Sequence, residues 1–230
     1  MTATECVLGS RSPRRRELLS LIVPEHQIRV LPPQDATEPG FDGMTSLDEI
    51  VDQLKLIARQ KHDDVRQQLN AGAIRQECQA RVITADTTIV ARDHRQLPVV
   101  LEKPPDDATY RDTVRYWFTE YLIGKSHSAI TAFCASEQGQ APVCRTVETR
   151  VTFRDDVKDC VDWYLETNEP KDKAGGYAIQ GAGSLFVAAI DGSLSNVIGL
   201  PLAEVRSLFE QWDKNDTGSR NEHRNGRSAG

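Results

Sequence analysis

Residues 5–23 read ECVLGSRSPRRRELLSLIV and predict a short strand, a turn and a helix in succession. The apolar run at residues 5–8 is typical of a buried strand, and Gly9 interrupts it. Ser12 is a favourable N-cap and Pro13 a favourable first helical residue, so the helix is expected to begin there. This strand–turn–helix unit places three basic side chains directly after the strand.

Those side chains are Arg14, Arg15 and Arg16, in the first turn of the predicted helix. Cations there oppose the helix macrodipole, by about 0.3–1 kcal/mol each. An anion that binds the arginines together with the free backbone N–H groups would explain them. Ser10, Arg14 and Arg15 are therefore predicted to bind phosphate groups, although a solvated basic helix end is the plain alternative.

Hydrophobic periodicity along the rest of the chain predicts strands and helices in mixed order. Strands are expected at residues 27–31, 81–85 with an extended continuation to 91, 97–101, 128–134, 143–153, 178–180 and 185–190. Helices are expected at residues 47–69, 106–117, 156–165 and from 201 to 212. Because strands and helices do not alternate regularly, the prediction is an α/β fold with a mixed sheet.

The last residues, 213–230, contain almost no apolar side chains and are rich in Asn, Gly, Arg and Ser. Such a composition cannot bury enough apolar surface to order itself. Residues 1–212 are therefore expected to form a single domain, followed by a disordered tail.

Composition excludes several classes of protein. The chain has 230 residues, of which 39% are hydrophobic, with 28 Lys and Arg against 34 Asp and Glu. The resulting net charge of −6 argues against a protein that coats nucleic acid, which needs a strong basic field. No apolar run approaches the length of a membrane-spanning helix, and we expect no signal peptide, because no basic segment followed by an apolar one stands before the first strand. The five cysteines form no CxxC pair, which favours reduced thiols in a cytoplasmic protein.

Three further segments carry chemically suitable residues. Asp86 is expected at the C-terminal end of a buried strand, where α/β proteins bind ligands. Lys103 precedes Pro104, and the proline restricts the backbone at Lys103, so that the lysine side chain projects from a rigid segment. Gln180 follows a glycine-rich loop and offers both an amide donor and an acceptor, which suits the edge of a pyrimidine base. Taken singly, each also fits an ordinary role as a turn cap, an exposed lysine or a glycine loop.

Six segments, in this order, resemble the Maf-like nucleotide pyrophosphatases over nearly the whole length up to Trp212. They are Gly9-Ser10-Arg11-Ser12-Pro13-Arg14-Arg15 with Glu17-Leu18-Leu19, Ala85-Asp86-Thr87, Glu102-Lys103-Pro104, Gly124-Lys125-Ser126-His127, Asp172-Lys173-Ala174-Gly175 with Ile179-Gln180-Gly181, and Val197-Ile198-Gly199-Leu200-Pro201. Family members often have Ser-Gly-x-Thr-His where this chain has Ile123 to His127, and alanine where it has Gly9. Those departures concern the rim of the site.

The resemblance implies a two-lobed α/β fold around a deep cleft, similar to inosine triphosphatases, in proteins that are often homodimers. It implies that Asp86 is the general base and, with Glu38, holds a divalent cation, Mg²⁺ or Mn²⁺. It implies phosphate binding by Ser10, Arg14, Arg15, Lys61 and Lys103. Members selective for dTTP and UTP carry residues that look like Arg14, Thr87 and Gln180, so the expected reaction converts these nucleotides to the monophosphate and pyrophosphate.

Two other classes of function stay open on sequence grounds. One is a non-catalytic nucleotide-binding regulator linked to cell division, against which the intact Asp86 and Lys103 speak. The other is an RNA-binding protein that uses Arg14 to Arg16. The acidic net charge and the lack of an aromatic platform beside these arginines argue against it.

Overall fold

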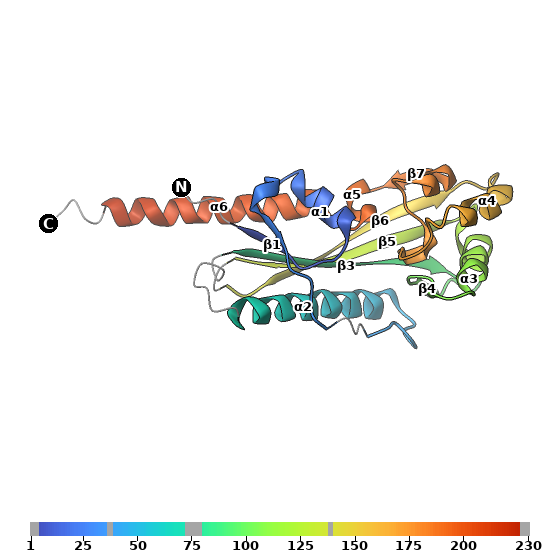
Figure 1. The fold of residues 1–230 in the computed structure, drawn as a ribbon, viewed down its shortest axis with the longest axis horizontal. Helices are drawn as coiled ribbons and strands as arrows, with labels where there is room; N and C mark the ends of the chain where they lie inside the picture. Colours follow the sequence, from blue (N-terminus) through green and yellow to red (C-terminus); the bar gives the residue numbers. More distant parts are fainter. Residues whose placement is uncertain (1–4, 36–38, 72–79, 138–139, 226–230) are drawn as a thin grey trace.

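The computed structural model describes residues 5–35, 39–71, 80–137 and 140–225, with side chains as far as residue 215. Its centre is a sheet of seven strands in the order β2-β1-β3-β5-β6-β7, with β4 paired to β3 (Figure 1). The strands are β1 (Cys6–Leu8), β2 (Ile28–Val30), β3 (Arg81–Arg92), β4 (Pro98–Leu101), β5 (Ser126–Ser136), β6 (Val143–Phe153) and β7 (Val187–Asp191). β1 is parallel to β2 and β3, whereas the other pairs are antiparallel. The predicted α/β fold with a mixed sheet is confirmed.

β3 is a long central strand with an interrupted edge. It pairs with β5 from Val82 to Val90 on one side. On the other side it pairs with β1 at residues 81–83 and with β4 at residues 89–92. Among the described residues, no strand covers the stretch 84–88 on this second edge. The opening exists because β1 ends at Leu8, opposite Ile83, and the pairing of β3 with β4 begins only at Ile89.

Helices cover both faces of the sheet (Figure 1). α2 (Leu47–Ala71) packs its apolar stripe on one face, against β3 and β5. On the opposite face lie α1 (Pro13–Ser20), α5 (Leu194–Ile198) and α6 (Leu202–Asn225). α3 (Tyr110–Trp117) and α4 (Val161–Glu166) pack around an aromatic cluster at the far end of the long strands. No helix in the described ranges is both long and apolar enough to cross a membrane.

Short helical turns join these elements. They are Glu25–Gln27, Phe118–Leu122 in π geometry, Lys158–Cys160, Ala174–Gly176 and Ala182–Phe186. The strand predicted at residues 178–180 is wrong, because Ile179 and Gln180 form a turn. The Gly181 N–H donates to the Ala178 carbonyl at 3.2 Å across this turn, and the Glu169 carboxylate accepts from the N–H groups of Ala182 and Gly183 just after it, both at 2.8 Å.

Two other predictions differ from the structure. Asp86 does not end a strand, since pairing with β5 carries β3 on to Arg92 and leaves Asp86 in its middle. Residues 213–225 were predicted as disordered, but α6 continues to Asn225. Extending a helix that packing has already nucleated costs much less than starting one, so a polar extension can follow an apolar first half. The division of the chain into one domain and a tail stays a prediction.

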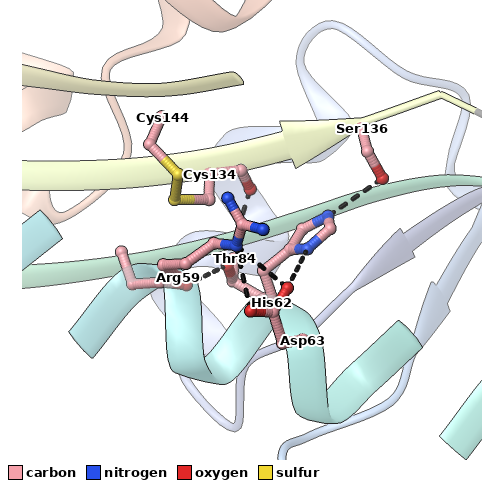
Figure 2. A network of polar contacts seen from close by, with 8 residues as sticks. Arg59, His62, Asp63, Thr84, Cys134, Ser136 and Cys144 are labelled. Carbon is pink, nitrogen blue, oxygen red and sulfur yellow. Dashed lines mark hydrogen bonds and ion pairs between the residues drawn. A yellow bond between two sulfur atoms is a disulfide. The ribbon is translucent and has the colours of Figure 1, made fainter. Parts of the chain in front are cut away.

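The prediction of reduced thiols is wrong for Cys134 and Cys144, which form a disulfide (Figure 2). These residues face each other across β5 and β6, with Cα atoms 4.1 Å apart. The strand register brings them together, and no Cys spacing motif announces it. Of the described cysteines, Cys6 and Cys160 carry free thiols.

Candidate active site

Arg15 is held at three points in the first turn of α1. Its Nε donates to the carbonyl oxygen of Gly199 at 2.9 Å. Nη1 and Nη2 donate to the hydroxyls of Ser10, at 3.3 Å, and Thr87, at 3.2 Å. Ser12 caps the helix as predicted and accepts from the Arg15 N–H at 3.5 Å. The structure therefore joins the turn after β1, the middle of β3 and the end of α5 through one guanidinium.

Gly199 has a conformational reason to be glycine. Its φ of 127° lies in a region that side-chain-bearing residues rarely adopt. Glycine thus allows the backbone conformation in which the carbonyl at the end of α5 accepts the Arg15 hydrogen bond.

Lys61 and Asp86 form the second contact of the site. The Lys61 ammonium of α2 lies 2.6 Å from the Asp86 carboxylate, and each side chain is 15% exposed. The pair is thus mostly shielded and still reachable from solvent. Only the family resemblance predicts a site role for Lys61. Its position along a long amphipathic helix does not distinguish it from the other polar residues of that helix.

Asp86 and Thr87 project from opposite faces of β3, as neighbouring residues of a strand must. Asp86 meets Lys61 of α2 on one face, and Thr87 meets Arg15 of α1 on the other. Both belong to the stretch 84–88, whose second edge lacks a strand partner among the described residues. A ligand at this open edge can therefore be reached by groups from both layers of helices.

Arg14 and Lys173 form a second basic group beside α1. Burial lowers the pKa of the Arg14 guanidinium, and the carboxylates of Asp172, Glu169 and Glu17 oppose that shift. Burial also lowers the pKa of Lys173, and the charge of Arg14 lowers it further. Arg14 Nε is buried and has no hydrogen-bond partner among the residues that the structure describes. Two cations with an orphaned donor are an arrangement that a bound anion would stabilise.

Lys173 is a candidate binding residue that the sequence prediction omitted. It precedes the turn Ala174–Gly176, in which Gly175 adopts a φ of 68° and packs against Ile89. The Gly175 N–H donates to the carbonyl of Glu102 at 3.1 Å. This bond joins the segment of Lys173 to that of Lys103, whose side chain is exposed. The signal for Lys173 was its place next to paired glycines, as for a ligand-facing loop.

The structure does not bring every predicted residue together. Gln180 is exposed in its turn, and no described contact links it to Thr87 or Asp86. Thr87 contacts Arg15 directly, whereas the selectivity prediction paired it with Arg14. Glu38 lies outside the described residues. The predicted arrangement of two lobes around a deep cleft stays a prediction.

The metal prediction can be compared with the donors present. No group of three or more His, Cys, Asp or Glu side chains within the described ranges is arranged to hold a metal ion. Asp86 supplies one carboxylate at the open edge of β3. Nucleotide-processing enzymes commonly hold Mg²⁺ through one or two carboxylates together with substrate phosphates. The donors therefore fit a cation that is bound jointly with a phosphate ligand.

Comparison with known proteins places the chain. The family profile described as Maf-like protein matches residues 5–212. A dTTP/UTP pyrophosphatase of Anaeromyxobacter sp. (strain Fw109-5) is 34% identical over 221 residues, covering 92% of this chain and 94% of that protein. A dTTP/UTP pyrophosphatase of Pyrococcus abyssi is 35% identical over 204 residues, covering 89% and 94%. The chain belongs to the family of Maf-like proteins.

Proposed function

We propose that this protein is a nucleoside triphosphate pyrophosphatase that hydrolyses dTTP and UTP to the monophosphate and pyrophosphate. The observation that carries the proposal is the open edge of β3, where Asp86 meets Lys61 of α2 on one face and the neighbouring Thr87 meets Arg15 of α1 on the other. A triphosphate is strongly anionic and needs such neutralisation before a nucleophile can approach. The names of the related proteins support pyrimidine triphosphates as the substrate class.

In the proposed reaction a water molecule attacks the α-phosphorus, and the bond from this phosphorus to the bridging oxygen of the β-phosphate breaks. Asp86 accepts the proton of the attacking water, and pyrophosphate leaves with the bonding electron pair. Lys61 holds the Asp86 carboxylate in place at 2.6 Å before substrate arrives. Arg14, Arg15, Lys103 and Lys173 bind phosphate oxygens, with the Ser10 hydroxyl beside Arg15.

A divalent cation, Mg²⁺ or Mn²⁺, is also part of the proposal. Of its two predicted ligands, Asp86 lies within the described residues and Glu38 does not. When bound, it would screen the charge of the phosphates. A cytoplasmic location and a homodimer are further proposals, made from the sequence and the family resemblance.

The test is Asp86→Asn, which keeps the size of the side chain and removes its charge and basicity. Release of pyrophosphate from UTP should fall by about 10²-fold or more, as on loss of a general base. Binding of a non-hydrolysable UTP analogue, measured by calorimetry, should persist because the cations remain. The matched control is Asp93→Asn, in the turn after β3, where the carboxylate accepts backbone N–H bonds from Arg95 and Leu97.

Three outcomes would contradict the proposal. Near-wild-type turnover in folded Asp86→Asn protein would remove Asp86 as the base. Orthophosphate as the sole product of the wild type would remove the pyrophosphatase activity. A nucleotide panel in which purine triphosphates are clearly preferred would remove the pyrimidine selectivity alone.

A further inference from the structure

A chain of hydrogen bonds runs along one face of the sheet, from Arg15 of α1 over β3 and β5 to α5. Arg15 Nη2 donates to the Thr87 hydroxyl at 3.2 Å. The Thr87 hydroxyl lies 2.9 Å from that of Thr131, the residue opposite it on β5. The Thr131 hydroxyl donates to the backbone carbonyl of Asn196 at 3.1 Å. Thr131 and Asn196 are fully buried, and neither belongs to the predicted site.

The direction of each hydrogen bond in this chain follows from the chemistry of its ends. A carbonyl oxygen only accepts, so the single hydroxyl hydrogen of Thr131 is used on Asn196. Thr87 must then donate its own hydrogen to Thr131. What Thr87 presents to Arg15 is therefore a lone pair, which a guanidinium requires because it only donates. Thr131 thus orients the Thr87 hydroxyl so that it accepts from Arg15.

Asn196 also fixes the position of a second acceptor of Arg15, the Gly199 carbonyl. Its side-chain amide donates to the Ala129 carbonyl at 3.0 Å and to the Thr149 hydroxyl at 3.1 Å. These bonds fasten the short helix α5 to β5 and β6. The same helix ends at Gly199, whose carbonyl accepts from Arg15 Nε. Two of the three acceptors that hold the guanidinium thus depend on contacts made by Asn196.

We propose that Thr131 and Asn196 are positioning residues, which orient Arg15 for binding the substrate phosphates. This inference rests on the proposed function, because it assigns to Arg15 a ligand of that site. A guanidinium binds phosphate best through two N–H groups in a fixed plane, so a loosened Arg15 would bind less tightly.

Thr131→Val tests the inference, since it removes the hydroxyl and nearly preserves shape. Without Thr131 as acceptor, the Thr87 hydrogen can turn toward Arg15 and bring two donors face to face. Loss of a hydrogen bond of this kind should raise KM for UTP about 3- to 10-fold, with a smaller change in kcat. Thr131→Ser keeps the hydroxyl and should restore KM. Thr152→Val, whose hydroxyl bonds Ser126 instead, is the matched control and should leave KM unchanged.

A merely structural role for Thr131 would reduce the folded, active fraction without raising KM. Combining Thr131→Val with Arg15→Lys separates the routes: if Thr131 acts through Arg15, the double variant should have the KM of Arg15→Lys alone. An unchanged KM in Thr131→Val would overturn the inference. So would equal defects in the Val and Ser variants, or effects that add fully to those of Arg15→Lys.

If the wild-type protein releases no pyrophosphate from any nucleoside triphosphate, the proposed function is wrong, and KM can no longer test the positioning role. The positioning role is then measured from the hydrogen exchange of the Arg15 Nε–H group by NMR. Exchange that is faster in Thr131→Val than in wild type and Thr131→Ser supports it. Equal rates in all three proteins overturn it.

Discussion

At the scale of single residues, His62, which follows Lys61 on α2, is the group beside the site whose pKa departs most from its usual value. The residue is 1% exposed, and Nε2 lies 2.9 Å from the Ser136 hydroxyl of β5 (Figure 2). Burial lowers the pKa of His62 to about 4, with Arg66 and Arg59 lowering it and Asp63 opposing the shift. The imidazole is therefore neutral in the folded protein near neutral pH.

This shift makes stability depend on pH in a defined direction. As pH falls from 6.5 to 4.5, the unfolded chain takes up a proton on His62 that the folded protein does not bind. The free energy of unfolding should therefore fall, by on the order of 2 kcal/mol from this group. Urea unfolding at both pH values should show a smaller loss in His62→Gln than in wild type. The exposed His26→Gln variant is the control, and equal losses in all three proteins would contradict the assignment.

At the scale of elements, the hairpin of β5 and β6 carries both the disulfide and Thr131, one of the two residues proposed to orient Arg15. Cys134 is buried beneath α2, and Cys144 faces it from β6 (Figure 2). The bond closes a short loop, since the two residues are 10 apart in sequence. It restricts the unfolded chain and ties together the strand of the positioning residue Thr131 and the strand of Thr149, which accepts a hydrogen bond from Asn196.

Cys144→Ser is expected to lower the free energy of unfolding by about 2–3 kcal/mol, the chain-entropy value for a loop of this size. Thermal unfolding with and without dithiothreitol measures it. Wild type should lose stability on reduction, whereas Cys144→Ser should not change further. Cys160→Ser removes a free thiol and should respond to reductant like wild type. A wild-type midpoint that ignores the reductant would count against a stabilising disulfide.

At the scale of the whole molecule, charge is distributed unevenly. The chain carries a net charge of −6, yet Arg14, Arg15, Lys61, Lys103 and Lys173 belong to segments around one edge of β3. An acidic surface repels a long polyanion, while a local basic group still attracts a small one. This distribution favours a nucleotide over a nucleic acid as the ligand.

A labelled single-stranded RNA should therefore show no saturable binding at about 0.15 M salt, where charges beyond about 8 Å are screened. Fluorescence anisotropy measures this, with the non-hydrolysable UTP analogue as the positive control by calorimetry. RNA binding that disappears in Arg14→Ala and Arg16→Ala would instead support the RNA-binding alternative.

Local signals in the sequence determined the elements and the candidate chemistry. The cap at Ser12, the amphipathic period of α2 and the alternation of β6 depend on near neighbours, so they can be recognised without a fold. Tertiary structure alone decided which groups meet. The extension of β3 past Asp86, the facing of Cys134 and Cys144, and the link from Arg15 to Asn196 all depend on strand register. Register depends on which face of each strand is buried and on the connection between the strands, so the pattern of one strand alone does not specify which residues face each other.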